Sequence, residues 1–349
     1  MTTQAKGGKT PLKMIIALPG ILLFWAMMEG ASYSIDFENS ILLSTLIFCL
    51  SMFVLTISAN EFTERSVELG DGLGLSHLAT GALIISIGTS APEIFSSVGA
   101  IVNDQPSLII GNVYGTIIAN TLLGIGLASI LATKPIAVHS EVVGTHSVVF
   151  LGACFLTIFC LYDGALGYID SIAVFICFFM YVSMCAKDRD VEASQNVGQG
   201  ALVLPLAVGI LCLLILFRSG DVVVASMISS AVLLGLPEIK VATTVLAIGT
   251  SIPEIVSAIV LSIKGRVDSL FGEIIGSNLI ALLGIFGFAG FFAGVALSGP
   301  ILIFLLVSVA VTGIITFVMM SDSKIIRIEG SILVLMFVVW VSILVGLKV

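Results

Sequence analysis

One short acidic pattern, Gly-Thr-Ser-x-Pro-Glu, occurs twice in the chain, at residues 88–93 and 249–254. Within each copy the serine and the glutamate are three residues apart and therefore share one face of a helix. Carboxylate, hydroxyl and carbonyl oxygens are the ligands that a hard cation such as Ca2+ prefers. The candidate ligands are the carbonyls of Gly88 and Gly249 and the side chains of Thr89, Ser90, Glu93, Thr250, Ser251 and Glu254.

A proline interrupts the helix in each copy. Pro92 and Pro253 have no N–H to donate to the carbonyl four residues earlier, so we expect a kink at each motif. A carbonyl freed at membrane depth is tolerated only where it faces protein or a wet cavity. The two motifs therefore predict backbone oxygens that point into a shared interior.

A polar row follows each motif at the same spacing of 161 residues. In the first copy it consists of Thr116 and Asn120, and in the second of Glu273, Ser277 and Ala281. Residues four apart lie on one helix face, and Glu273 is two turns, about 12 Å, from Ala281. We expect water to fill the position that Ala281 vacates. Two interpretations of Glu273 stay open: it lines the access path and attracts cations, or it is solvated at a helix end.

Both motif glutamates fall near the middle of apolar segments. A carboxylate at the bilayer centre costs roughly 2.5 kcal/mol or more on insertion scales. Two such residues at equivalent positions of a repeat therefore predict a function for Glu93 and Glu254 rather than a structural role alone.

The composition is that of a membrane protein, with 58% apolar and 10% charged residues and a net charge of −8. The sequence has no stripe of basic residues interleaved with aromatic ones, so it does not predict a nucleic-acid-binding surface. Eleven apolar segments could each span a bilayer. They cover residues 12–28, 41–60, 75–102, 107–132, 142–161, 166–186, 200–218, 238–263, 269–293, 300–320 and 327–347.

The arrangement of the spans predicts topology and domains. With a cytoplasmic amino terminus, eleven of the fourteen Lys and Arg residues fall in cytoplasmic loops. Five spans separate equivalent positions of the two copies, so the second is predicted to be inverted, as in many transporters. The predicted domains are residues 1–40, an extra helix or a signal segment; 41–186, the first five-helix repeat; 187–198, a cytoplasmic linker; and 199–349, the second repeat.

Residues 58–131 and 219–292 resemble the alpha repeats of the cation/calcium exchanger superfamily, in particular its sodium/calcium exchanger branch. The likeness rests on the two motifs, each followed by Gly-x-x-x-Gly and a serine or threonine. The resemblance implies an all-α polytopic membrane protein with ten core helices in two inverted five-helix repeats. It also implies a secondary-active antiporter of the plasma or inner membrane that exchanges Ca2+ for Na+ by alternating access, with no cofactor and no enzymatic reaction.

The resemblance also implies roles for single residues. It implies that Glu93 and Glu254 bind both Ca2+ and Na+, and that the hydroxyls of Ser90, Ser251, Thr116 and Ser277 bind chiefly Na+. It further implies that Thr89 and Thr250 line the helix breaks and that Asn120 is a further polar position of the site. Ala281 departs from the family, which commonly has Asp or Asn there. A proton-coupled exchanger of Ca2+ or another divalent cation therefore stays the alternative, and the sequence leaves the oligomeric state open.

Overall fold

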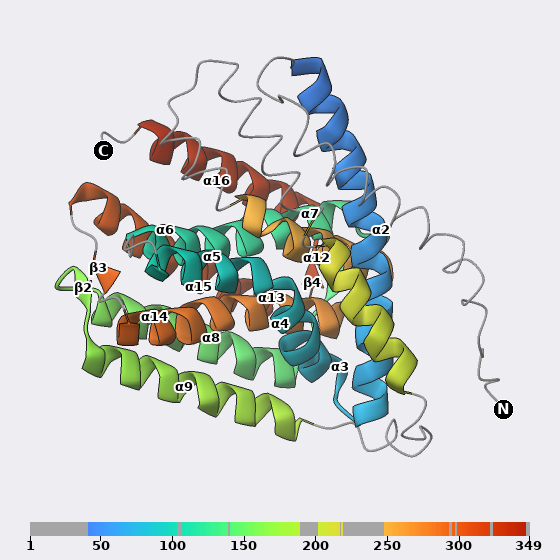
Figure 1. Cartoon of the computed structure of the whole chain (residues 1–349), viewed down its shortest axis with the longest axis horizontal. Coiled ribbons are helices and arrows are strands. Elements are labelled where there is room, and N and C mark those ends of the chain that lie inside the picture. The colour runs from blue at the N-terminus through green and yellow to red at the C-terminus, as the bar shows by residue number, and fades with distance from the viewer. Residues whose placement is uncertain are drawn as a thin grey trace.

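The computed structural model describes residues 41–102, 107–138, 140–188, 202–216, 218, 248–292, 295–296, 299–321 and 324–346. Most of these residues are helical, and Figure 1 shows long helices packed side by side. Four very short strands form two pairs. The predicted segment 12–28 and most of the 187–198 linker lie outside the described residues, as does the start of the span predicted over 238–263.

The elements of the first half begin with a long helix and end with another. They are α2 (Ile41–Leu73), α3 (His77–Ala79), η2 (Thr80–Ile85), α4 (Ser86–Thr89), α5 (Ala91–Val102), α6 (Ser107–Ile118), η3 (Ala119–Ile125), α7 (Gly126–Leu131), β1 (Ile136–Ala137), α8 (Ser140–Cys160), β2 (Ala165–Leu166) and α9 (Tyr168–Lys187). The η elements are π-helical turns, which are frequent at functional sites.

The second half starts, among the described residues, with a helix over Val203–Leu216. It continues with α12 (Ile252–Ile263), α13 (Val267–Leu279), η6 (Ile280–Ile285), α14 (Phe286–Phe292), β3 (Val295–Ala296), α15 (Pro300–Ser321), β4 (Lys324–Ile325) and α16 (Arg327–Gly346). The local structure repeats with the sequence, because α5 and α12, and likewise η3 and η6, begin 161 residues apart.

The helix breaks fall at the serine of each motif. Helix α4 ends at Thr89 and α5 starts at Ala91, with Ser90 between them at φ −79° and ψ 6°. Ser251 has nearly the same backbone angles, φ −83° and ψ −2°, directly before α12. Pro253 lies in the first turn of α12, where a missing N–H removes no helical hydrogen bond. The span predicted over 75–102 therefore consists of two helical pieces that meet at Ser90, two residues before Pro92 and close to the kink expected at the motif.

The two halves contact each other through paired strands and packed helices. Strand β1 of the first half pairs antiparallel with β4 of the second, and β2 pairs antiparallel with β3. Helix α7 packs against α16, and α14 packs in the same way against α9. These two strand pairs and these two helix pairs thus recur with the roles of the halves reversed.

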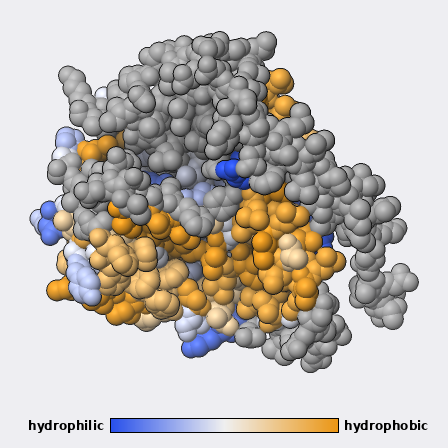
Figure 2. Space-filling model, viewed as in Figure 1, coloured by the Kyte–Doolittle hydropathy of each residue, from blue (hydrophilic) through white to orange (hydrophobic). Residues whose placement is uncertain are grey.

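Five helical segments of the described chain are long and apolar enough to cross a membrane, namely Ile109–Leu131, Tyr168–Lys187, Val267–Phe292, Pro300–Ser321 and Arg327–Gly346. The first and third of these are 83% buried inside the protein, whereas the other three are at most 33% buried. The two buried segments carry the polar rows and form the interior. The three outer helices expose apolar side chains such as Ile169 and Ile303, and Figure 2 shows broad apolar surface on the described part of the viewed face. Such a surface suits contact with lipid.

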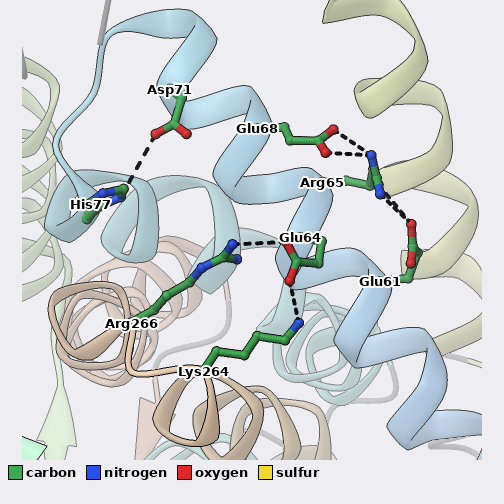
Figure 3. Close-up of polar contacts among 8 residues, drawn as sticks. All are labelled: Glu61, Glu64, Arg65, Glu68, Asp71, His77, Lys264 and Arg266. Carbon is green, nitrogen blue, oxygen red and sulfur yellow. Dashed lines mark hydrogen bonds and ion pairs between the residues drawn. The ribbon is translucent and has the colours of Figure 1, made fainter. Parts of the chain in front are cut away.

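An ionic clasp ties α2 to the turn between α12 and α13 (Figure 3). Glu64 of α2 contacts Lys264 Nζ at 2.7 Å and Arg266 Nη2 at 3.0 Å. Between these two basic residues, Gly265 has φ +71°, a backbone conformation that favours glycine. The clasp joins the first half of the chain to the second at one end of the molecule.

Candidate cation site

The two motif glutamates lie completely buried at equivalent places. Glu93 is in the first turn of α5 and Glu254 in the first turn of α12, and neither side chain is exposed. The first turn of a helix carries the positive end of the helix dipole, which stabilises a carboxylate. The break before each helix therefore positions each acid where its charge costs least.

Hydroxyl groups from both halves surround Glu254. Ser90 Oγ, at the break of the first half, donates to Glu254 Oε1 at 3.1 Å and lies within hydrogen-bond distance of Ser277 Oγ, at 2.9 Å. Ser277 Oγ in turn lies 3.5 Å from the same carboxylate oxygen, and Thr89 lies beside it. Thr89 also donates to the carbonyl of Ile85 in its own helix. The serine of one motif thus bonds to the glutamate of the other.

Glu93 has a matching environment. It lies beside Thr116 of its own half and Thr250 of the other half, and it is close enough to Glu254 for the two carboxylates to repel each other. Thr250 Oγ1 also donates to Asn112 Oδ1 at 3.3 Å. Each glutamate therefore meets hydroxyls from the opposite motif and from the polar row of its own half.

Asn120 belongs to an amide cluster that the sequence analysis did not anticipate. Its Nδ2 donates to Asn278 Oδ1 at 3.3 Å, and Asn278 Nδ2 donates to Thr121 Oγ1 at 3.1 Å. The signal for Asn278 was present, since an amide in an apolar helix directly after Ser277 needs a partner. It was missed because the repeat aligns Asn278 with Ile117, an apolar residue.

The remaining predicted residues are also buried, but they contribute differently. Ser251 Oγ has no hydrogen-bond partner within the described part of the chain, and Gly249 is buried beside it. Gly88 packs so closely on the ring of Phe62 that a Cβ atom would clash, so its small size has a packing role. Glu273 is wholly buried in α13, so the interpretation of a solvated side chain at a helix end is wrong.

The oxygen atoms around Glu93 and Glu254 suit a divalent cation that is bound by two carboxylates and otherwise by neutral ligands. No group of three His, Cys, Asp or Glu side chains gathers within the ranges that the structure describes. Two carboxylates balance the charge of one Ca2+, and hydroxyls, carbonyls and water can complete its six to eight oxygen ligands in flexible geometry. Mg2+ demands a stricter octahedral shell and gives up water reluctantly, so it fits less well.

Fold and buried acids together define a helical membrane protein with a polar interior. The family model "Sodium/calcium exchanger protein" matches residues 43–187 and 204–346. The chain therefore belongs to the sodium/calcium exchanger protein family, which consists of membrane antiporters rather than enzymes.

Curated relatives cover most of the chain. The "Putative antiporter CaxA" of Alkalimonas amylolytica is 28% identical over 324 residues, covering 85% of this chain and 97% of the relative. The "Sodium/calcium exchanger MaX1" of Methanosarcina acetivorans is 25% identical over 344 residues, covering 86% and 97%. Among solved structures, the sodium-calcium exchanger NCX_Mj has a TM-score of 0.76 at 23% identity, covering 88% of this chain and 100% of that one. The structural likeness shows a shared fold.

Proposed function

We propose that the protein is a secondary-active antiporter that exchanges Ca2+ for Na+ at the site formed by Glu93 and Glu254. The observation that carries this proposal is the reciprocal arrangement of the acids. Ser90 of the first motif bonds to Glu254, and Thr250 of the second lies beside Glu93. A single ion held between these groups would be bound by both halves at once.

Shared ligands explain why exchange is favoured over leakage. Two buried carboxylates without a cation repel each other in a medium that screens charge poorly. The empty site is therefore costly to move between the two sides of the membrane, whereas an occupied one is nearly neutral. One Ca2+ or two monovalent ions satisfy the same pair, so transport in one direction requires return with the other ion.

The exchanged contacts between the halves support the inverted repeat and alternating access. Pairing of β1 with β4 and of β2 with β3 is reciprocal, as is packing of α7 on α16 and of α14 on α9. Transporters with inverted repeats carry their substrate sites at broken helices between the repeats and rock one part against the other. The breaks at Ser90 and Ser251 each lie directly before the helix that carries a motif glutamate.

The described basic residues support a cytoplasmic location for one end. Lys264 and Arg266 end α12 and start α13, and Ser262 of α12 donates to the carbonyl of Ala128 in α7. Arg327 donates to the Ala132 carbonyl just beyond α7, so it lies at the same end. Accumulation of Lys and Arg at one end is typical of the cytoplasmic side.

The coupling ion is the point that an experiment must decide, because Ala281 lacks the oxygen that the first copy has in Asn120. The full-length protein is reconstituted into vesicles loaded with Na+ and diluted into Na+-free buffer with 45Ca2+. Vesicles loaded with K+ and vesicles with an imposed pH gradient serve as controls. We expect uptake only with the Na+ gradient. Uptake driven by the pH gradient alone would replace Na+ by H+, and no saturable uptake would refute exchange.

A further inference from the structure

A third buried carboxylate, that of Glu273, lies next to the candidate site. Its side chain is 0% exposed, and neither of its oxygens has a hydrogen-bond partner among the described residues. Among the described residues, Glu254, another carboxylate, is close enough to repel its charge. The basic residues of the turn before the same helix, Lys264 and Arg266, contact Glu64 instead. A buried carboxylate is stable only when something compensates its charge.

Oxygen atoms from neighbouring elements approach Glu273. Ser257 of α12 lies beside it, and Ser257 Oγ is 3.3 Å from Thr63 Oγ1 of α2. One turn earlier on α13, Ser269 Oγ is buried with no hydrogen-bond partner in the described ranges. On the η2 side, Gly81 packs so tightly on the Ser269 carbonyl and the Glu273 N–H that any side chain there would clash. One buried acid thus lies among several buried hydroxyl groups.

The pocket is separate from the Glu93 and Glu254 pair. Ser277, which belongs to the environment of Glu254, is one turn further along α13, about 6 Å along the helix axis. The three glutamates do not form a three-acid metal group within the described chain. One carboxylate with neutral hydroxyls balances a single positive charge, so this position suits a monovalent rather than a divalent cation.

We infer that Glu273, Ser257 and Thr63 form a second cation position that binds one Na+, between the Glu93 and Glu254 pair and the ionic clasp. The inference rests on the proposed exchange function and adds to it the place of one coupling ion. Several hydroxyl oxygens favour Na+, because a dehydrated Na+ needs several oxygen ligands, whereas a protonated carboxyl needs one acceptor. Repulsion between Glu273 and Glu254 couples the two positions.

Two measurements on the full-length protein test this inference separately from the exchange function. Equilibrium binding of 22Na+ to purified protein needs no transport. In vesicles, 45Ca2+ uptake against internal Ca2+ measures self-exchange without Na+, and uptake against internal Na+ measures coupled exchange. For Glu273→Gln we expect one fewer Na+ bound and coupled exchange reduced about tenfold or more, with self-exchange within about twofold of wild type.

Ser257→Ala is the second variant, because it keeps every charge. We expect it to raise the half-saturating Na+ concentration about fivefold. Ser262→Ala is its matched control: this hydroxyl, on the same helix, donates to the Ala128 carbonyl, and its loss should leave Na+ binding unchanged. Size-exclusion chromatography confirms that each variant is folded.

The outcomes separate the two proposals. Unchanged Na+ binding in Glu273→Gln overturns the Na+ position, and equal loss of self-exchange and coupled exchange makes Glu273 part of the Ca2+ site instead. A Glu273→Gln variant that loses only pH-driven uptake assigns the position to a proton and also overturns the inference. If wild-type vesicles show neither mode of Ca2+ flux, the exchange function fails, while 22Na+ binding to Glu273→Gln still decides the Na+ position.

Discussion

The two copies of the motif agree at the glutamates and differ in the polar rows that follow. Where the first copy has Asn112 and Asn120, the second has Glu273 and Ala281. Asn112 is neutral and bonded, since it accepts from Thr250 and donates to Ser97 Oγ at 3.4 Å. Glu273 is an acid whose oxygens have no hydrogen-bond partner among the described residues. The second copy has therefore lost an oxygen at one end of its row and gained a charge at the other.

This difference indicates which features the exchange mechanism requires in both halves. The glutamates, the helix breaks and the hydroxyls from opposite motifs are present twice, as a site held by both halves demands. The ends of the rows are unequal, so any ion bound there is bound by one half more than by the other. Asn278 supplies the second half with an amide near this end of the row, because its side chain accepts a hydrogen bond from Asn120 across the interface. The predictions below test this division, starting with the shared part.

Replacement of either shared acid should have the largest effect. Glu93→Gln or Glu254→Gln removes one charge and a bidentate ligand from the pair, so we expect 45Ca2+ uptake to fall about 100-fold or more while membrane insertion is unchanged. Glu68→Gln is the control, because Glu68 is exposed and contacts Arg65 on the surface of α2. Uptake at the wild-type rate in either variant would refute the proposed site.

Restoration of an oxygen at position 281 should have the next largest effect. Ala281 is buried, so a charged side chain there acts where charge is screened poorly. We expect Ala281→Asp to lower the half-saturating Na+ concentration about tenfold through its charge. Ala281→Asn adds almost the same volume without charge, and it controls for overpacking, which typically costs about 1–3 kcal/mol. If neither variant changes the dependence of 45Ca2+ uptake on Na+, position 281 lies off the ion path.

Removal of the motif serines should have unequal effects in the two copies. Ser90 Oγ donates to Glu254 and lies within hydrogen-bond distance of Ser277, whereas Ser251 Oγ has no hydrogen-bond partner within the described residues. We expect Ser90→Ala to raise the half-saturating Ca2+ concentration about tenfold and Ser251→Ala about threefold, because a hydrogen bond to a charged group contributes about 1.5–3 kcal/mol. Initial rates of 45Ca2+ uptake over a range of Ca2+ concentrations measure both. The reverse order would contradict the observed asymmetry.

The sequence was a good guide to local features of the site and a poor one to its partners. The motif prolines predicted the breaks next to Ser90 and Ser251, because loss of an N–H acts within one helical turn. Spacing placed Ser90 on one face with Glu93, yet Ser90 bonds to Glu254 of the other copy. Which side chains meet across the halves depends on their packing, which one copy of the motif does not encode. The pairing of Asn120 with Asn278 was missed for the same reason.

The ionic clasp lies at one end of the molecule, and its removal should have the smallest effect. Lys264, Arg266 and Glu64 are about a quarter to a third exposed, and such pairs contribute about 0.2–1 kcal/mol each. Because the clasp joins α2 to the α12–α13 turn, it stabilises the arrangement of these two elements that the structure shows. We expect the double variant Lys264→Ala and Arg266→Ala to change the rate of Na+-driven 45Ca2+ uptake about two- to fivefold, without changing the half-saturating Ca2+ concentration.

Arg65→Ala is the matched control, because Arg65 pairs with Glu61 and Glu68 of its own helix and joins no other element through these contacts. Its loss should leave the rate of uptake unchanged. The difference between the clasp variant and wild type should also shrink at high ionic strength, since salt screens exposed charges.

Charge reversal gives the decisive test. Glu64→Lys alone places three positive charges together and should separate α2 from the α12–α13 turn. Adding Lys264→Glu and Arg266→Glu to the same chain should restore the wild-type rate. Failure of this rescue, with all variants folded, would show that the contact between the halves is incidental to transport.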